Sequence, residues 1–283
     1  LLYGMSMQEA LEKIGCVPDC QLPEASPVLY AHRQAEGKDI YFLSNQSDQE
    51  IEVTPEFRIQ GKQPEWWDAT TGKIRRLPAF EFTEDGTQVP LRLAPFESAF
   101  IVFRQKGKAS ATGIEANCPR PETWMTLDKD WNVTFKDSIR GPKQMQSFDQ
   151  LIDISTHPDE SIRYYSGTLV YDKQITIDQL PAGNIYLNLQ DIGVTAKVTV
   201  NGQYAGGVWT PPYRLDISEW LHKGENQISV EITTTWQNRL IGDSRLPEQE
   251  RTTWTACNGW SEKDPLQKSG LIGPVTLEVV KRE

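Results

Sequence analysis

Short runs in which apolar and polar residues alternate dominate the chain from Val28 onward. Turn-forming pairs such as Thr71-Gly72 and Asp85-Gly86 separate these runs. Short strands spaced this closely are typical of a β-sandwich rather than of alternating strands and helices. The predicted strands of this first region are 28–31, 40–43, 51–53, 57–59, 65–67, 73–77, 80–83, 88–93 and 98–103.

A second β-rich region follows a small, polar stretch at 105–121, which we interpret as a linker because it has no apolar period. Asn201-Gly202 is the strongest hairpin signal, since a tight type I′ turn requires positive φ at both central residues. We predict a small sandwich domain at 25–106 and a second sandwich domain at 107–283. The predicted strands of the second domain are 131–135, 166–177, 185–189, 196–200, 228–233 and 275–280.

One helix is predicted at 6–14. Ser6 can cap its start with Glu9 three residues later, Leu11 and Ile14 share one face, and Gly15 ends it. Such a short helix has little to pack against. We therefore interpret residues 1–24 as the remnant of a preceding domain in a longer chain.

Charge, apolar runs and cysteine spacing exclude several classes of partner and cofactor. The 283 residues carry a net charge of −10, which argues against nucleic acid and anionic membrane surfaces as partners, and no apolar run is long enough to span a bilayer. Cys16 and Cys20 are either unpaired or form one local disulfide, and the scattered histidines do not complete a zinc site with them. No metal site or other cofactor is expected. A structural calcium ion at Asp191, Asp216 or Asp243 stays unassigned, because their spacing matches no loop site.

Several phrases between 163 and 243 occur in an order that carries information. Val198-Thr199-Val200-Asn201-Gly202 is followed by Pro211-Pro212-Tyr213-Arg214, and then by Leu221 and Gly224-Glu225-Asn226. This series resembles the sugar-binding, galactose-binding-like jelly roll of glycoside hydrolase family 2. The residues are also explained by turns and strand ends alone, without a ligand.

A second resemblance covers most of the chain. The phrase 66–72, the phrase 93–103 and the closing 269–275 are similar to the C-terminal region of family 106 α-L-rhamnosidases. The resemblance implies an all-β chain of two antiparallel β-sandwich domains, the second a galactose-binding-like jelly roll. It also implies a secreted or periplasmic parent enzyme whose catalytic carboxylates lie on an upstream barrel. A barrel needs about 250 residues of alternating strand and helix, so we expect no catalytic residue in this chain.

Carbohydrate is the expected ligand, because sugars pair an apolar C–H face with hydroxyl edges and so favour aromatic rings beside hydrogen-bonding groups. The alternative is that several of these tryptophans pack against the missing barrel. Acidic residues near them, such as Glu248 and Asp264, are interpreted as a solvated loop rather than a catalytic pair. The candidate carbohydrate-binding residues are Trp209, Tyr213, Trp236, Asn238, Arg239, Trp254 and Trp260.

Together these observations predict the non-catalytic C-terminal portion of an α-L-rhamnosidase-like glycoside hydrolase, which supports the barrel and shapes carbohydrate binding. The alternatives are a free-standing carbohydrate-binding module, which would bind isolated sugars, and a structural interaction module.

Overall fold

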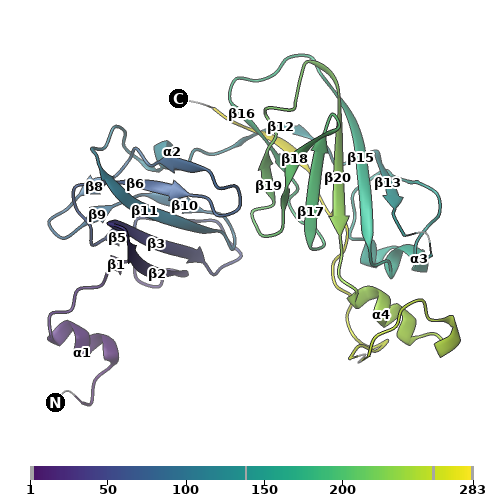
Figure 1. The fold of residues 1–283 in the computed structure, drawn as a ribbon, viewed down its shortest axis with the longest axis horizontal. Helices are drawn as coiled ribbons and strands as arrows, with labels where there is room; N and C mark the ends of the chain where they lie inside the picture. Colours follow the sequence, from purple (N-terminus) through teal and green to yellow (C-terminus); the bar gives the residue numbers. More distant parts are fainter. Residues whose placement is uncertain (1–2, 138, 257–258, 282–283) are drawn as a thin grey trace. The chain divides into compact units, whose positions relative to one another are not determined.

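The computed structural model describes residues 3–137, 139–256 and 259–281. The chain forms two compact units, Leu1–Arg120 and Pro121–Glu283. Figure 1 shows the first in purple to blue and the second in teal to yellow. Every pairing between the named strands is antiparallel, so the predicted all-β class is confirmed.

The first unit is built on a five-stranded sheet in the order β2-β3-β11-β6-β7. Strict alternation in β3 buries Asp39, Tyr41, Leu43 and Asn45 on one face, as period-2 patterning requires. These strands are β2 (Val28–Ala35), β3 (Lys38–Asn45), β6 (Lys62–Trp67), β7 (Ile74–Arg76) and β11 (Ser98–Lys106).

Two smaller sheets complete this unit, in the orders β1-β5-β9-β8 and β10-β4. Tyr41, Phe57 and Phe103 are fully buried in its core, and the Tyr41 ring packs edge to face with both phenylalanine rings. The strands are β1 (Cys20–Gln21), β4 (Ile51–Val53), β5 (Glu56–Phe57), β8 (Glu81–Phe82), β9 (Thr87–Gln88) and β10 (Leu91–Leu93).

The segment 107–120, which we predicted to be a linker and assigned to the second domain, lies within the first unit. It contains the short helix α2 (Ile114–Asn117). Asn117 is fully buried, donates to the carbonyls of Ala79 (2.6 Å) and Pro90 (2.9 Å), and accepts from the Ala79 amide (2.9 Å). This buried asparagine, together with the Arg92–Glu115 ion pair, ties a segment of loop-like composition to the sandwich.

The second unit is a sandwich of a six-stranded sheet, β14-β13-β15-β20-β17-β18, and a four-stranded sheet, β12-β21-β16-β19. Its core includes the fully buried Trp131, Tyr165 and Tyr171. The strands are β12 (Glu122–Thr126), β13 (Trp131–Phe135), β14 (Gln146–Phe148), β15 (Thr168–Ile177), β16 (Asn184–Asn188), β17 (Thr195–Val200), β18 (Gln203–Val208), β19 (Arg214–Asp216), β20 (Gly224–Thr233) and β21 (Thr276–Val280).

The predicted Asn201-Gly202 turn joins β17 to β18, with φ of 51° and 76°. Asn201 also contacts the phrase Gly224-Glu225-Asn226, because its Nδ2 donates to Asn226 Oδ1 (2.9 Å). Asn226 Nδ2 in turn donates to the carbonyls of His222 (2.7 Å) and Gly224 (3.0 Å). The two phrases therefore occur together because their side chains hold one pair of turns.

The N-terminal helix is confirmed as α1 (Met7–Lys13), and the Ser6–Glu9 pair caps it reciprocally. The structure adds helices that the sequence did not reveal: α3 (Glu160–Arg163), α4 (Gln237–Ser244) and the 3₁₀ turns η1 (Ile154–Thr156) and η2 (Glu248–Glu250). Among the described helices, none is long and apolar enough to cross a membrane. Cys16 and Cys20 are unbonded, so the local disulfide does not form here; Cys257 lies outside the described residues.

Candidate functional site

One end of the second unit collects most of the candidate residues. In the six-stranded sheet, β13, β20 and β18 end where β14, β15 and β17 begin, as the pairs Phe135–Leu169, Thr168–Thr233 and Ala196–Val208 show. Helix α4 follows β20 directly at this end (Figure 1). We call it the α4 end.

Exposed apolar side chains gather there. Ile139, Met145 and Val194 flank the strand ends. Trp209 (66% exposed) follows β18, and Trp236 (51% exposed) follows β20. Trp254 (88% exposed) and Trp260 (40% exposed) lie on the loop that leaves α4. Exposed tryptophans concentrated at one end of a sandwich mark a surface for interaction rather than for core packing.

Trp236 and Tyr213 present polar neighbours as well as rings. The Arg140 guanidinium lies 4.5 Å from the centre of the Trp236 ring, which fixes one face of this indole by a cation–π contact. Tyr213 is partly buried beside the core. Burial, reinforced by the negative charge of Asp191, raises the pKa of the Tyr213 phenol, so it stays a neutral hydroxyl that can both donate and accept.

Asn238 and Arg239 lie inside the fold rather than on its surface. Asn238 forms a two-way bridge with the backbone of Gln267, donating to its carbonyl (2.7 Å) and accepting from its amide (2.8 Å). The Arg239 side chain is paired with Asp243 at 2.5 Å, and its amide donates to Ser166 Oγ (3.1 Å). Both side chains are buried, and the contacts they make hold α4 in place.

Asp243, which the sequence suggests only as an unassigned calcium ligand, holds a loop in place in the structure. It is 2% exposed, and its Oδ2 accepts from the amides of Thr252 (3.1 Å) and Thr253 (2.9 Å) and from the Thr253 hydroxyl (2.6 Å). These bonds anchor the chain immediately before Trp254. An exposed indole on an anchored backbone loses little conformational entropy when it binds a ligand.

The acidic residues of the same loop lie at or near the surface. Glu248, Glu250 and Glu262 are exposed, and Asp264 bonds the amide and hydroxyl of Ser261 at 2.6 and 2.8 Å. In the part of the chain that the structure describes, no group of three or more His, Cys, Asp or Glu side chains is placed to hold a metal ion.

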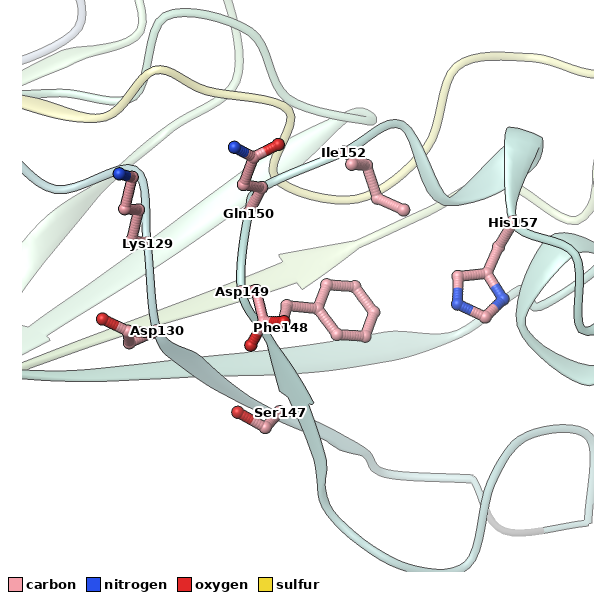
Figure 2. A pocket seen from close by; sticks show the side chains of 8 residues that line it. All are labelled: Lys129, Asp130, Ser147, Phe148, Asp149, Gln150, Ile152 and His157. Carbon is pink, nitrogen blue, oxygen red and sulfur yellow. The ribbon is translucent and has the colours of Figure 1, made fainter.

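The other candidate is a cavity of about 620 Å³ beside the edge strand β14. Figure 2 shows its lining, which comes from the β14 strand and the loops around it. None of the predicted carbohydrate-binding residues is among them. The lining residues are Lys129, Asp130, Ser147, Phe148, Asp149, Gln150, Ile152 and His157.

Two family models match separate parts of the chain. Residues 1–82 match the α-L-rhamnosidase family, glycoside hydrolase 106. Residues 154–268 match the glycosyl hydrolase 2 galactose-binding domain-like family. The second match covers the part of the α4 end that lies between η1 and the Gln267 bridge.

Individual relatives extend these matches. A putative beta-glucuronidase of Formosa agariphila is 32% identical over 234 residues, which is 74% of this chain and 19% of that protein. The solved rhamnosidase from Novosphingobium sp. PP1Y is 32% identical, with a TM-score of 0.84 over 96% of this chain and 26% of that one. The chain thus spans about a quarter or less of these relatives. Its predicted resemblance to the C-terminal region of family 106 α-L-rhamnosidases, with a family 2-type galactose-binding-like domain, is confirmed.

Proposed function

We propose that this chain is the non-catalytic portion of an α-L-rhamnosidase-like glycoside hydrolase, and that its α4 end shapes carbohydrate binding next to the catalytic barrel. The observation that carries the proposal is the anchored, exposed Trp254. Flat aromatic faces stack on the apolar C–H face of a pyranose, and neighbouring polar groups read its hydroxyls.

The proposed partners are the upstream catalytic barrel and carbohydrate. The net charge of −10 supports the exclusion of nucleic acid. A secreted or periplasmic location follows from the resemblance to glycan-degrading enzymes and is part of the same proposal.

Trp254→Ala and Trp209→Ala test the role of the α4 end. In an enzyme that contains the chain after its barrel, we expect each substitution to raise KM for a rhamnose-terminated oligosaccharide about tenfold and to leave kcat nearly unchanged, since a subsite that binds ground and transition states equally affects KM alone. The control is Tyr204→Ala, which replaces an exposed aromatic side chain on β18 away from the α4 end and should change neither KM nor kcat. Trp131 is not a suitable control because it lies in the core. Unchanged KM in both tryptophan variants would refute the proposal.

The free-standing carbohydrate-binding module remains the second candidate, because the same tryptophans could act without a barrel. It predicts that the isolated chain binds an oligosaccharide in a calorimeter and loses that affinity with Trp254→Ala. Calorimetric silence of the isolated chain, together with a KM effect in the barrel-containing enzyme, favours the first candidate. The coding sequence upstream of Leu1 gives a direct check, since the first candidate requires a barrel in the same reading frame.

A further inference from the structure

The cavity beside β14 has the composition of a saccharide site, although no motif pointed to it. Phe148 and Ile152 supply an apolar floor, and the hydroxyl of Ser147, the amide of Gln150 and the ammonium of Lys129 stand around it (Figure 2). Six of the eight lining residues are polar or charged, which suits the hydroxyl groups of a sugar, and about 620 Å³ lies within the usual range of volumes of small-ligand sites.

The floor is rigid. Phe148 is buried, pairs with Trp131 across the strands, and packs edge to face on Tyr171 with ring centres 6.4 Å apart. Its ring lies parallel to that of His157, at 6.1 Å and 9°. A site on fixed side chains does not have to order them when a ligand enters, which lowers the entropic cost of binding.

His157 adds a donor of defined direction. Its Nδ1 accepts a hydrogen bond from the Asp159 amide (3.1 Å), so in the neutral ring the proton sits on Nε2. A ring nitrogen that donates complements the acceptor oxygens of Asp130 and Asp149, and hydroxyl ligands need both kinds of partner.

The charges around the cavity select among sugars. The cavity is lined by two carboxylates, Asp130 and Asp149, and by one ammonium, that of Lys129. The neighbouring Lys173 ammonium is engaged by the carbonyls of Lys129 (2.7 Å) and Asp130 (3.4 Å). A sugar that bears a carboxylate is disfavoured here, because the lining has no excess of positive charge to offset the desolvation of that carboxylate.

We propose that this cavity is a second saccharide-binding site, separate from the α4 end, and that it accepts an uncharged pyranose rather than a uronic acid. It lies on the second unit alone, and its lining shares no residue with the proposed tryptophan surface. The proposal does not depend on the function assigned to the α4 end.

The test is ¹⁵N-resolved NMR titration of the whole chain with methyl α-L-rhamnopyranoside, methyl β-D-glucopyranoside and methyl β-D-glucuronide. We expect at least one neutral glycoside to shift the amide resonances of Ser147, Asp149 and Gln150. The glucuronide should bind with an affinity at least tenfold lower. Asp149→Ala and Gln150→Ala should each lower the affinity for the neutral glycoside about tenfold. Ser147→Trp should abolish binding, because the larger side chain fills the cavity. All three positions are exposed, so the fold tolerates them.

Gln144→Ala, an exposed neighbour outside the lining, is the matched control and should leave the titration unchanged. Trp254→Ala should also leave it unchanged, which separates this site from the α4 end. The inference is overturned if neither neutral glycoside shifts the cavity amides at concentrations up to about 100 mM. A Kd of that size corresponds to a binding free energy of only about 1.4 kcal/mol. The inference is equally overturned if the glucuronide binds more tightly, or if Trp254→Ala removes the shifts.

Discussion

At the scale of single residues, buried polar side chains hold the α4 end and its loop in place. Asp243, Asn238 and Asn201 each bridge segments that are distant in sequence or belong to different elements. A buried carboxylate or amide is costly unless its hydrogen bonds are made, so each of these positions specifies one local arrangement. Their sequence signal is weak, because only Asn201 stands in a recognisable turn motif.

Asp243→Ala should destabilise the second unit by about 3 kcal/mol, because it removes the acceptor for Thr252 and Thr253 and leaves the Arg239 guanidinium buried without its partner. Urea denaturation measures this loss. Limited proteolysis should cut within 245–268 faster than in the unsubstituted chain. Asp178→Ala, at an exposed position of the same unit, is the control. Equal cleavage rates in both variants would contradict the anchoring role of Asp243.

Gly270, within the phrase 269–275, allows a second test. Its φ is +90°, and a Cβ there would lie 2.6 Å from the hydroxyl of the fully buried Tyr171. Gly202 also has positive φ (+76°), but open space surrounds it. Gly202→Ala should therefore lower the free energy of unfolding by about 1 kcal/mol. Gly270→Ala should lower it by about 2 kcal/mol more, because the added Cβ clashes with Tyr171. Similar unfolding midpoints for the two variants would contradict the packing explanation.

At the scale of elements, alternation of apolar and polar residues predicted most strands correctly, including 98–103 and 228–233, now β11 and β20. It missed α4, because the helix follows β20 after only three residues and buries polar side chains, Asn238, Arg239 and Asp243, in place of an apolar stripe. For the same reason Asn238 and Arg239 looked like ligand contacts. The tryptophans were recognisable as loop residues, whereas their common end became visible only through strand order.

The segment 107–120 shows how tertiary contacts override composition. Asn117→Ala should destabilise the first unit by about 2 kcal/mol, since the Ala79 amide loses its acceptor in a buried place. Thr112→Ala, at an exposed position of the same segment, should change stability by less than about 0.5 kcal/mol. Denaturant unfolding of both variants provides the comparison. An Asn117→Ala variant as stable as the unsubstituted chain would contradict the tethering role of Asn117.

At the scale of the whole molecule, the two units have separate hydrophobic cores. Buried residues from Cys20 to Phe103 form one cluster, and those from Leu127 to Val279 form the other. Each unit falls within the size range in which single domains fold alone. The domain boundary predicted from composition, 106/107, differs from the boundary between the two compact units, 120/121, because the contacts of α2 leave no signal in the composition.

A fragment comprising residues 121–283 should therefore fold by itself, and a fragment beginning at 107 should gain nothing from its extra residues. We expect both to unfold cooperatively in urea with the same midpoint, because residues 107–120 make their hydrogen bonds to the first unit. The cavity of the second unit should keep its saccharide affinity in the shorter fragment, since all eight lining residues lie between 129 and 157. A fragment 121–283 that fails to unfold cooperatively, while 107–283 does, would place the boundary where the composition suggested.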